Sequence, residues 1–281
     1  MNAPLTAMPD LRTLLELTVE TISEASAIIL RIRDKGFRTE KKSDSSPVTE
    51  ADHASESCIL EKLRRAYPDI IAISEEEFSA GIRPATGHTY WLIDPLDGTR
   101  GFASGGDDYA VNIGLISRGE PVLGVVAIPS AGQIYGGGKG LGAFRQDRSG
   151  RHEIHTVPVP KEGLRVLASR HYGSEERLHN FLAGKKVQSI GNMGSAVKIV
   201  RIAEGNADFY PRFGPTMEWD TAAPQAILEA AGGHLYVNNG ARMSYDKKDR
   251  LNPPFYCSGS TIILPEPQDN LAGNEKDGSL P

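Results

Sequence analysis

The chain has 281 residues, of which 39% are hydrophobic and 24% are charged, a balance typical of a globular protein. No apolar stretch approaches the roughly 20 residues that a transmembrane helix needs, and the N-terminus lacks the basic and apolar regions of a signal peptide. The net charge of −5 gives no general attraction for nucleic acid phosphates. We therefore expect a cytoplasmic protein without an integral membrane segment or a nucleic-acid partner.

Cys58 and Cys257 are the only cysteines. Cys58 falls within a helical pattern and Cys257 within a short apolar run, so both are expected to be small buried residues. Two cysteines in a chain of this size imply neither a disulfide framework nor a zinc site. The lack of a disulfide framework is typical of a protein from a reducing environment.

Apolar residues recur at helical spacing over residues 11–33 and 50–66, which predicts two amphipathic helices. Asp10 and Thr49 precede these segments, and their side chains suit the N-cap position. The polar stretch between the helices, residues 39–47, is expected to be an exposed loop.

Short apolar runs separated by turn residues follow the second helix and predict strands. The expected strands cover residues 70–73, 90–93, 109–116, 122–128, 134–135 and 142–145. The glycine-rich run 136–142 matches neither a phosphate-binding loop nor a dinucleotide fingerprint, so a flexible hairpin is expected there. This part of the chain is predicted to form an antiparallel meander behind the two helices.

From residue 163 onward, strand and helix patterns alternate. The expected strands cover 164–168, 187–190 and 207–210, and the expected helices cover 175–182, 195–204 and the segment from about 220 to 232. Pro224 is compatible with the last helix because the first helical turn has no intrahelical N–H bonds to lose.

The run Asp-Pro-Leu-Asp-Gly-Thr at residues 94–99 follows an apolar segment. Asp94 is predicted to end a buried strand, and Asp97 to lie in the loop beyond it, because Pro95 and Gly98 favour a turn. Hard oxygen ligands at a strand terminus suit Mg²⁺. The alternative is an ordinary strand followed by a turn in which Asp is merely tolerated.

Three further acids occupy similar settings, at the end of a strand or the start of a helix. Glu75 follows a predicted strand, Asp220 opens a predicted helix, and Asp52 lies in the first turn of another. Each alone has a simpler explanation, as a solvated turn or a capping residue. Their occurrence together with the 94–99 run favours a metal site.

Four segments carry a family resemblance, at residues 47–52, 73–76, 91–99 and 219–223. In these segments the sequence resembles the inositol monophosphatase superfamily, whose members are Mg²⁺-dependent, lithium-sensitive phosphatases. The run Pro-Arg-Phe-Gly-Pro-Thr at 211–216 resembles the CysQ branch, the 3′(2′),5′-bisphosphate nucleotidases of sulfur metabolism.

The resemblance implies a layered α/β fold, an αβαβα sandwich of two αβ halves with the active site between them. The expected division is an N-terminal half over residues 1–160, a C-terminal half over 161–264 and a disordered polar tail over 265–281. A homodimer and peripheral association with the cytoplasmic face of the inner membrane are further expectations.

The resemblance also implies roles for individual residues. Glu75, Asp94 and the Leu96 carbonyl would hold one Mg²⁺, and Asp94, Asp97 and Asp220 a second, in a site of two or three ions. The expected catalytic set is Asp52, Thr99, Glu75 and Asp94, with the first two positioning and deprotonating the attacking water. The expected substrate contacts are Glu75, Leu96, Asp97, Gly98, Thr99, Ser195, Lys198, Arg212, Asp220 and His171.

This metal set agrees with the electrostatics, because clustered carboxylates would repel a bisphosphate unless metal cations invert the local charge. The expected reaction converts 3′-phosphoadenosine 5′-phosphate to AMP and phosphate. Two segments depart from the branch: residues 100–102 are Arg-Gly-Phe rather than Lys-Glu-Phe, and 194–196 are Gly-Ser-Ala as in inositol monophosphatases. An inositol or sugar monophosphatase is therefore the alternative, and a non-catalytic phosphonucleotide-binding protein is a more distant one.

Overall fold

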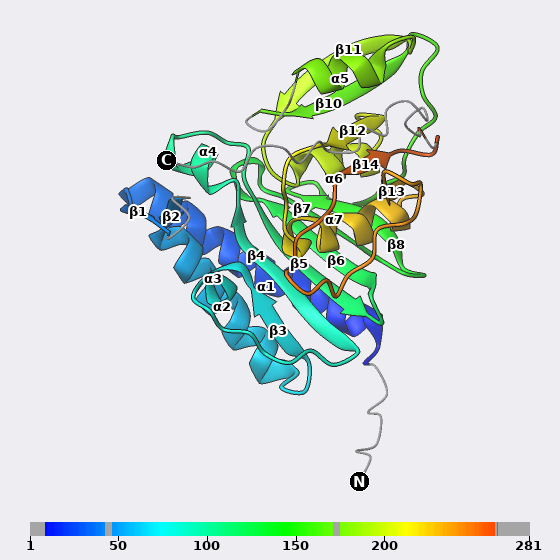
Figure 1. The fold of residues 1–281 in the computed structure, drawn as a ribbon. Coiled ribbons are helices and arrows are strands. Elements are labelled where there is room, and N and C mark those ends of the chain that lie inside the picture. The colour runs from blue at the N-terminus through cyan, green and yellow to red at the C-terminus, as the bar shows by residue number, and fades with distance from the viewer. Residues whose placement is uncertain (1–8, 43–46, 171–174, 262, 264–281) are drawn as a thin grey trace, which may run out of the picture.

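The computed structural model describes residues 9–42, 47–170, 175–261 and 263. Helices α1 (Leu11–Lys35) and α2 (Glu50–Ala66) lie where the sequence predicts them (Figure 1). Asp10 caps α1 by accepting the Thr13 N–H at 3.0 Å. Thr49 and Asp52 form a capping box at the start of α2, with the Thr49 N–H donating to Asp52 Oδ2 at 2.8 Å. The predicted N-caps are thus confirmed.

The first large sheet has seven strands whose spatial order follows their order in the chain. They are β3 (Ile71–Ser74), β4 (Thr89–Asp97), β5 (Ala110–Ser117), β6 (Glu120–Ile128), β7 (Gln133–Gly138), β8 (Gly142–Asp147) and β9 (Gly150–Glu153). From β4 onward all neighbours are antiparallel, as predicted, whereas β3 runs parallel to β4. The parallel pair places the carboxyl ends of β3 and β4 at the same edge.

The second sheet has five strands in the order β11-β10-β12-β14-β13. The strands are β10 (Leu164–Ser169), β11 (Val187–Met193), β12 (Phe209–Arg212), β13 (His234–Val237) and β14 (Phe255–Ser258). The helices of this half are α5 (Glu175–Leu182), α6 (Val197–Ala203) and α7 (Glu218–Ala230). The predicted alternation of strands and helices is confirmed up to α7.

Three clusters of buried apolar side chains separate five layers. One lies between α1 and α2 and the first sheet, and includes Leu14 and Trp91. The second lies between the two sheets, around α6 and α7, and includes Leu92 and Ile227. The third lies between the second sheet and α5, and includes Phe181. The predicted αβαβα sandwich is therefore confirmed (Figure 1).

Helix α7 packs against the first sheet with almost no space between the backbones. A Cβ atom at Gly124 would lie 2.1 Å from the Ala223 carbonyl oxygen. The glycine-rich run belongs to the same contact: a Cβ at Gly137 would lie 3.2 Å from Ile227 Cα. The predicted hairpin is confirmed, because β7 and β8 pair antiparallel, but only residues 139–141 turn the chain and the glycines at 136–138 are strand residues that let a helix approach.

Other differences from the sequence expectations are local. Residues 39–41 form strand β1 (Thr39–Lys41), which pairs antiparallel with β2 (Pro47–Thr49), instead of an exposed loop. Pro224 lies inside α7 rather than in its first turn, because the helix begins at Glu218. The short helices α3 (Glu75–Ser79) and α4 (Thr99–Ala103) and strands β9, β13 and β14 were not predicted.

Both cysteines are free, Cys257 is buried and Cys58 is only partly buried, against the expectation of two buried residues. Within the described ranges, no helix is long and apolar enough to cross a membrane. The expected boundary at residues 160 and 161 falls between β9 and β10. The tail at 265–281 lies outside the described residues.

Candidate active site

The acidic turn is a bulge within a strand. The prediction that strand β4 ends at Asp94 is wrong, because the strand continues to Asp97. Its register against β5 shifts between these two residues. Leu96 donates its N–H to Asp94 Oδ1 at 3.0 Å, which fixes the carboxylate inside the bulge. Gly98 follows with a φ of +96°, and a Cβ there would lie 2.9 Å from the Asp108 carbonyl oxygen. Only glycine fits both restrictions.

Three carboxylates from three elements converge beside this bulge. Glu75 begins α3 directly after β3, Asp94 lies in β4, and Asp220 is the third residue of α7. One oxygen from each lies within 4.8 Å of the others. The parallel ends of β3 and β4 bring the first two together, and the first turn of α7 closes over them. Such an all-oxygen donor set fits Mg²⁺.

The cluster is electrostatically frustrated without a cation. Burial, followed by the charges of Glu75, Asp97 and Asp220, raises the pKa of Asp94 well above its usual value. Burial and the neighbouring carboxylates also raise the pKa of Asp220 to about 8. Burial likewise raises the pKa of Asp97, although Lys198 opposes the shift. A divalent cation would reverse this by favouring the ionised forms.

A lysine that sequence reasoning did not single out already supplies one positive charge. Lys42 Nζ lies 2.7 Å from Glu75 Oε1 and 2.7 Å from Glu76 Oε1. Burial would lower the pKa of Lys42, but the two glutamate charges outweigh it and raise this pKa. Burial and the charge of Glu75 raise the pKa of Glu76 to about 7. The ammonium thus neutralises part of the acidic cluster.

Asp52 and Thr99 meet beside the bulge, as the family resemblance implies. Thr99 Oγ1 lies 3.0 Å from Asp52 Oδ1 and 3.0 Å from the Leu96 carbonyl oxygen. The other Asp52 oxygen accepts the Thr49 hydroxyl at 2.6 Å, so the carboxylate is held from both sides. Burial raises the pKa of Asp52, which makes this carboxylate a better proton acceptor.

The turn before α6 brings in the second half of the chain. Ser195 has a φ of +49°, and its carbonyl oxygen accepts a hydrogen bond from Lys198 Nζ at 2.7 Å. Lys198 is 2% exposed, and burial lowers its pKa to about 8 although Asp97 opposes the shift. It is therefore a buried cation rather than a solvated surface lysine. The Ala196 N–H donates to Asp97 Oδ2 and links this turn to the acidic bulge.

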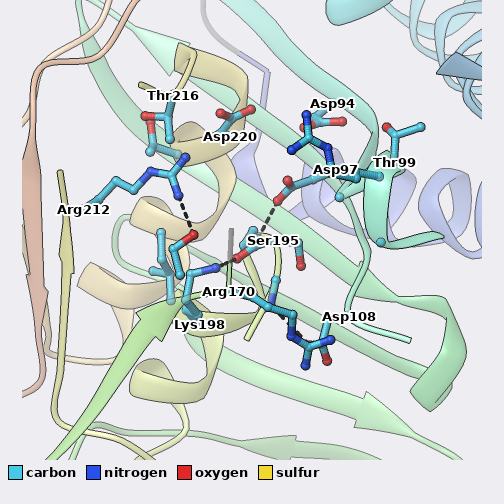
Figure 2. Close-up of a pocket in the computed structure, with 18 of the residues that line it drawn as sticks. Asp94, Asp97, Thr99, Asp108, Arg170, Ser195, Lys198, Arg212, Thr216 and Asp220 are labelled. Atoms are coloured by element: carbon cyan, nitrogen blue, oxygen red, sulfur yellow. Dashed lines mark hydrogen bonds and ion pairs between the residues drawn. The ribbon is translucent and has the colours of Figure 1, made fainter. Parts of the chain in front are cut away.

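Arg212 is a second buried cation, at the end of β12. Its guanidinium donates to Ser169 Oγ at 2.9 Å and to the Pro215 carbonyl oxygen at 2.8 Å. These contacts fix the group beside Lys198, and Figure 2 shows both side chains facing the same pocket as Asp220 and Asp97. The sequence alone could not tell such a side chain from a solvated strand residue.

The acids and the cations line one cavity of about 290 Å³ between the two halves. Of the predicted site residues, it is lined by Glu75, Asp94, Leu96, Asp97, Gly98, Thr99, Ser195, Lys198, Arg212 and Asp220. Asp97 lies outside the three-carboxylate cluster, because its carboxylate is directed at Ala196. His171 lies outside the described residues, so its predicted contact stays a prediction.

Besides Lys42, sequence reasoning missed other polar residues at this cavity or next to it, among them Asp108, Arg170 and Asn112. Asp108 and Arg170 line the cavity and form an ion pair of 2.6 Å with each other. Asn112 lies directly opposite Asp94 on β5, is fully buried, and has no hydrogen-bond partner for its amide among the described residues. A polar residue inside the apolar run of β5 was the only available signal for Asn112.

The five-layer fold, with carboxylates of α3, β4 and α7 at the junction of its halves, defines a class of protein. The sequence profile of the inositol monophosphatase family matches residues 10–271, and the chain belongs to this family. The family membership inferred from the motifs is therefore confirmed.

Individual relatives narrow the similarity. The 3′(2′),5′-bisphosphate nucleotidase CysQ of Salmonella typhimurium is 38% identical over 245 residues, which are 86% of this chain and 98% of that protein. The CysQ of Buchnera aphidicola is 34% identical over 252 residues, which are 88% of this chain and 94% of that protein. The predicted similarity to the CysQ branch is thus confirmed.

Solved structures agree with this placement. CysQ from Bacteroides thetaiotaomicron, a bacterial member of the inositol monophosphatase family, matches with a TM-score of 0.75 at 28% identity, covering 90% of this chain and 99% of that one. An inositol monophosphatase from Anabaena matches with a TM-score of 0.70 at 25% identity. The match covers 90% of this chain and 93% of that one.

Proposed function

We propose that this protein is a Mg²⁺-dependent phosphatase that removes the 3′-phosphate of 3′-phosphoadenosine 5′-phosphate and releases AMP and phosphate. The observation that carries the proposal is that two groups of opposite charge line one cavity, and we call them its acidic end and its cationic end. One end holds the carboxylates Glu75, Asp94 and Asp220, and the other holds the buried cations Lys198 and Arg212. A substrate with two phosphates would match both ends, and CysQ relatives are named as bisphosphate nucleotidases.

Mg²⁺ would be held by the carboxylates of Glu75, Asp94, Asp97 and Asp220 and by the Leu96 carbonyl. When bound, it would lower the pKa of a water molecule and stabilise the leaving oxygen. Gly98 and Thr99 lie beside this site, where their N–H groups can face the 3′-phosphate. We propose that two or three ions bind there.

The chain's own contribution to proton transfer comes from Thr99 and Asp52. A water molecule at Thr99 Oγ1 could lose a proton to that oxygen while Thr99 passes its own proton to Asp52 Oδ1, 3.0 Å away. The raised pKa of Asp52 brings its proton affinity closer to what a general base needs.

At the other end, Lys198 and Arg212 would bind the 5′-phosphate, the arginine through a forked contact and the lysine as a point charge. The Ser195 hydroxyl would donate a hydrogen bond to the same phosphate. Both cations are held by carbonyl oxygens in the structure, so they are already oriented before a ligand arrives.

The test is a substrate panel with purified protein and saturating Mg²⁺. It compares 3′-phosphoadenosine 5′-phosphate with inositol 1-phosphate and fructose 1,6-bisphosphate by phosphate release. We expect kcat/KM to be at least about 100-fold higher for the nucleotide, because inositol 1-phosphate has no second phosphate and fructose 1,6-bisphosphate holds its two phosphates at a different spacing. Preferential hydrolysis of inositol 1-phosphate would overturn the proposal.

An inositol or sugar monophosphatase is the second candidate. The Gly-Ser-Ala form of residues 194–196 favours it, and the Anabaena inositol monophosphatase has the same fold. In that case Lys198 and Arg212 would face the cavity without an anionic ligand group, which is why we favour the bisphosphate. Loss of catalysis altogether is disfavoured because Glu75, Asp94, Asp97, Asp220 and Thr99 line the cavity and Thr99 is hydrogen-bonded to Asp52.

A further inference from the structure

Asp108 connects the two halves of the chain at the mouth of the cavity. It lies in the segment between α4 and β5. Its Oδ2 atom is 2.6 Å from an Arg170 guanidinium nitrogen and 3.3 Å from the Gly194 backbone nitrogen, which donates to it. Figure 2 shows Asp108 and Arg170 facing each other on the side of the cavity away from Asp220.

The backbone of Asp108 makes a second pair of contacts. Its carbonyl oxygen would lie 2.9 Å from a Cβ at Gly98 and 2.7 Å from a Cβ at Gly194. The acidic turn and the turn before α6 therefore rest against the same peptide group. Neither turn has room for a side chain at that point.

The segment that carries Asp108 is itself fixed to the N-terminal half. Arg33 of α1 forms an ion pair of 2.8 Å with Asp107 and donates to the Gly105 carbonyl oxygen at 3.1 Å. Ser130 Oγ donates to the Asp107 carbonyl oxygen at 2.7 Å. Asp108 is thus a fixed point, and Arg170 and Gly194 are the groups that it holds.

The Gly194 turn in turn positions the cationic end of the cavity. The carbonyl oxygen of the next residue, Ser195, accepts a hydrogen bond of 2.7 Å from the Lys198 ammonium. A shift of Gly194 would therefore move the anchor of Lys198 relative to the carboxylate cluster. The distance between these two ends must match the distance between the two phosphates of a substrate.

We propose that Asp108, through Arg170 and Gly194, is a positioning residue that sets the spacing between the two ends and so selects bisphosphate over monophosphate substrates. It does not touch the substrate itself. This inference rests on the proposed function, because only a substrate that reaches both ends senses their spacing.

The test compares the kcat/KM for 3′-phosphoadenosine 5′-phosphate with that for 3′-AMP, which lacks the 5′-phosphate. Asp108→Asn keeps an acceptor for the Gly194 N–H but removes the ion pair, and Asp108→Leu removes both. We expect the ratio of the two kcat/KM values to fall about fivefold in the Asn variant, in line with a half-exposed ion pair, and further in the Leu variant. The loss should appear mainly as a higher KM for the bisphosphate.

A double variant separates positioning from direct substrate contact. If Arg170 acts only through Asp108, then Arg170→Gln lowers the ratio as much as Asp108→Asn does, and the double variant is no worse than either. If Arg170→Gln lowers the ratio further in the Asp108→Asn background, Arg170 contacts the substrate and the positioning role is overturned.

Glu16→Gln is the matched control, because Glu16 forms a similar pair with Arg151, at 2.6 and 2.9 Å, far from the cavity. It should leave the ratio unchanged. An unchanged ratio in folded, active Asp108 variants, with folding checked by thermal unfolding, overturns the inference alone. A wild-type protein that does not hydrolyse the bisphosphate overturns the proposed function, and the inference with it.

Discussion

At the scale of single residues, Asp220 illustrates how the site stores unfavourable charge. Its carboxylate accepts the Met217 N–H at 2.9 Å, a contact that favours the ionised form. Burial and the charges of Asp97 and Glu75 outweigh that contact and raise its pKa to about 8. The ionised Asp220 carboxylate is thus positioned to bind a cation, and it lowers the stability of the folded protein when no cation is bound.

This arrangement predicts how the stability of metal-free protein depends on pH. The pKa of Asp220 is about 8 in the folded protein against 3.8 for a solvated aspartate, so the folded state binds more protons between these limits. Its stabilising contribution is complete below pH 4 and is lost as the pH rises toward 8. We expect the Tm in EDTA to fall by about 3 °C or more between pH 5.5 and 8.

Differential scanning fluorimetry with and without Mg²⁺ checks this prediction. Because Mg²⁺ binds the ionised carboxylates, the Tm increase that it causes should grow with pH over the same range. Asp220→Asn keeps an acceptor for Met217 but removes the charge, so it should flatten the pH profile in EDTA. A metal-free Tm that is constant or rises over this range would contradict the assignment.

The residues of the site differ in how well the sequence reveals them. Asp94 and Asp220 could be found because each lies in a short motif whose residue types restrict both backbone and chemistry. Asp108 and Arg170 could not, because they are about 60 positions apart and neither lies in such a motif. Their pairing depends on how the two halves meet, which no local pattern encodes.

At the scale of elements, the position of α7 connects packing with chemistry. The helix lies on strands β5 and β6, and Gly124 leaves space for the Ala223 backbone. The first turn of the same helix carries Asp220 into the carboxylate cluster. A change in the helix–sheet distance should therefore alter both stability and metal binding.

Gly124→Ala tests this connection. The added Cβ would lie 2.1 Å from the Ala223 carbonyl oxygen, so the helix must move away from the sheet. We expect a destabilisation of about 1–3 kcal/mol in urea unfolding. Displacement of Asp220 should also lower kcat/KM at saturating Mg²⁺ about tenfold or more.

Gly87→Ala is the control, because nothing lies within 4 Å of a Cβ at that position. It should change the stability by less than about 0.5 kcal/mol. If Gly124→Ala loses stability but keeps full activity and Mg²⁺ affinity, the helix–sheet distance does not control the site.

The elements that the sequence predicts are those with a strong local signal. Helices α1 and α2 have apolar faces and side-chain caps, and both end within two residues of the prediction. Strands β1 and β2 have three residues each, too few for a pattern, and form only because they pair with each other. The glycines of β7 were misinterpreted because the helix that requires them comes about 90 residues later in the chain.

At the scale of the whole molecule, the two halves share one core. The cluster between the sheets joins side chains of β4 and β6, such as Leu92 and Val126, to α6 and α7 of the C-terminal half. The division at residues 160 and 161 therefore describes two parts of one packing unit, and remains a prediction as a domain boundary. The homodimer, the cytoplasmic location and the membrane association also remain predictions.

A shared core predicts that the protein unfolds in a single cooperative transition. The two tryptophans report on different layers: Trp91 lies in the cluster beneath α1 and α2, and Trp219 in the cluster between the sheets. Urea unfolding of Trp91→Phe and Trp219→Phe, followed by fluorescence, then isolates each reporter. In each variant, the urea midpoint from fluorescence should agree with the midpoint from far-UV circular dichroism within about 0.2 M. Separate unfolding of the second half, with Trp219 fluorescence lost before the remaining secondary structure, would show that the halves are independent domains.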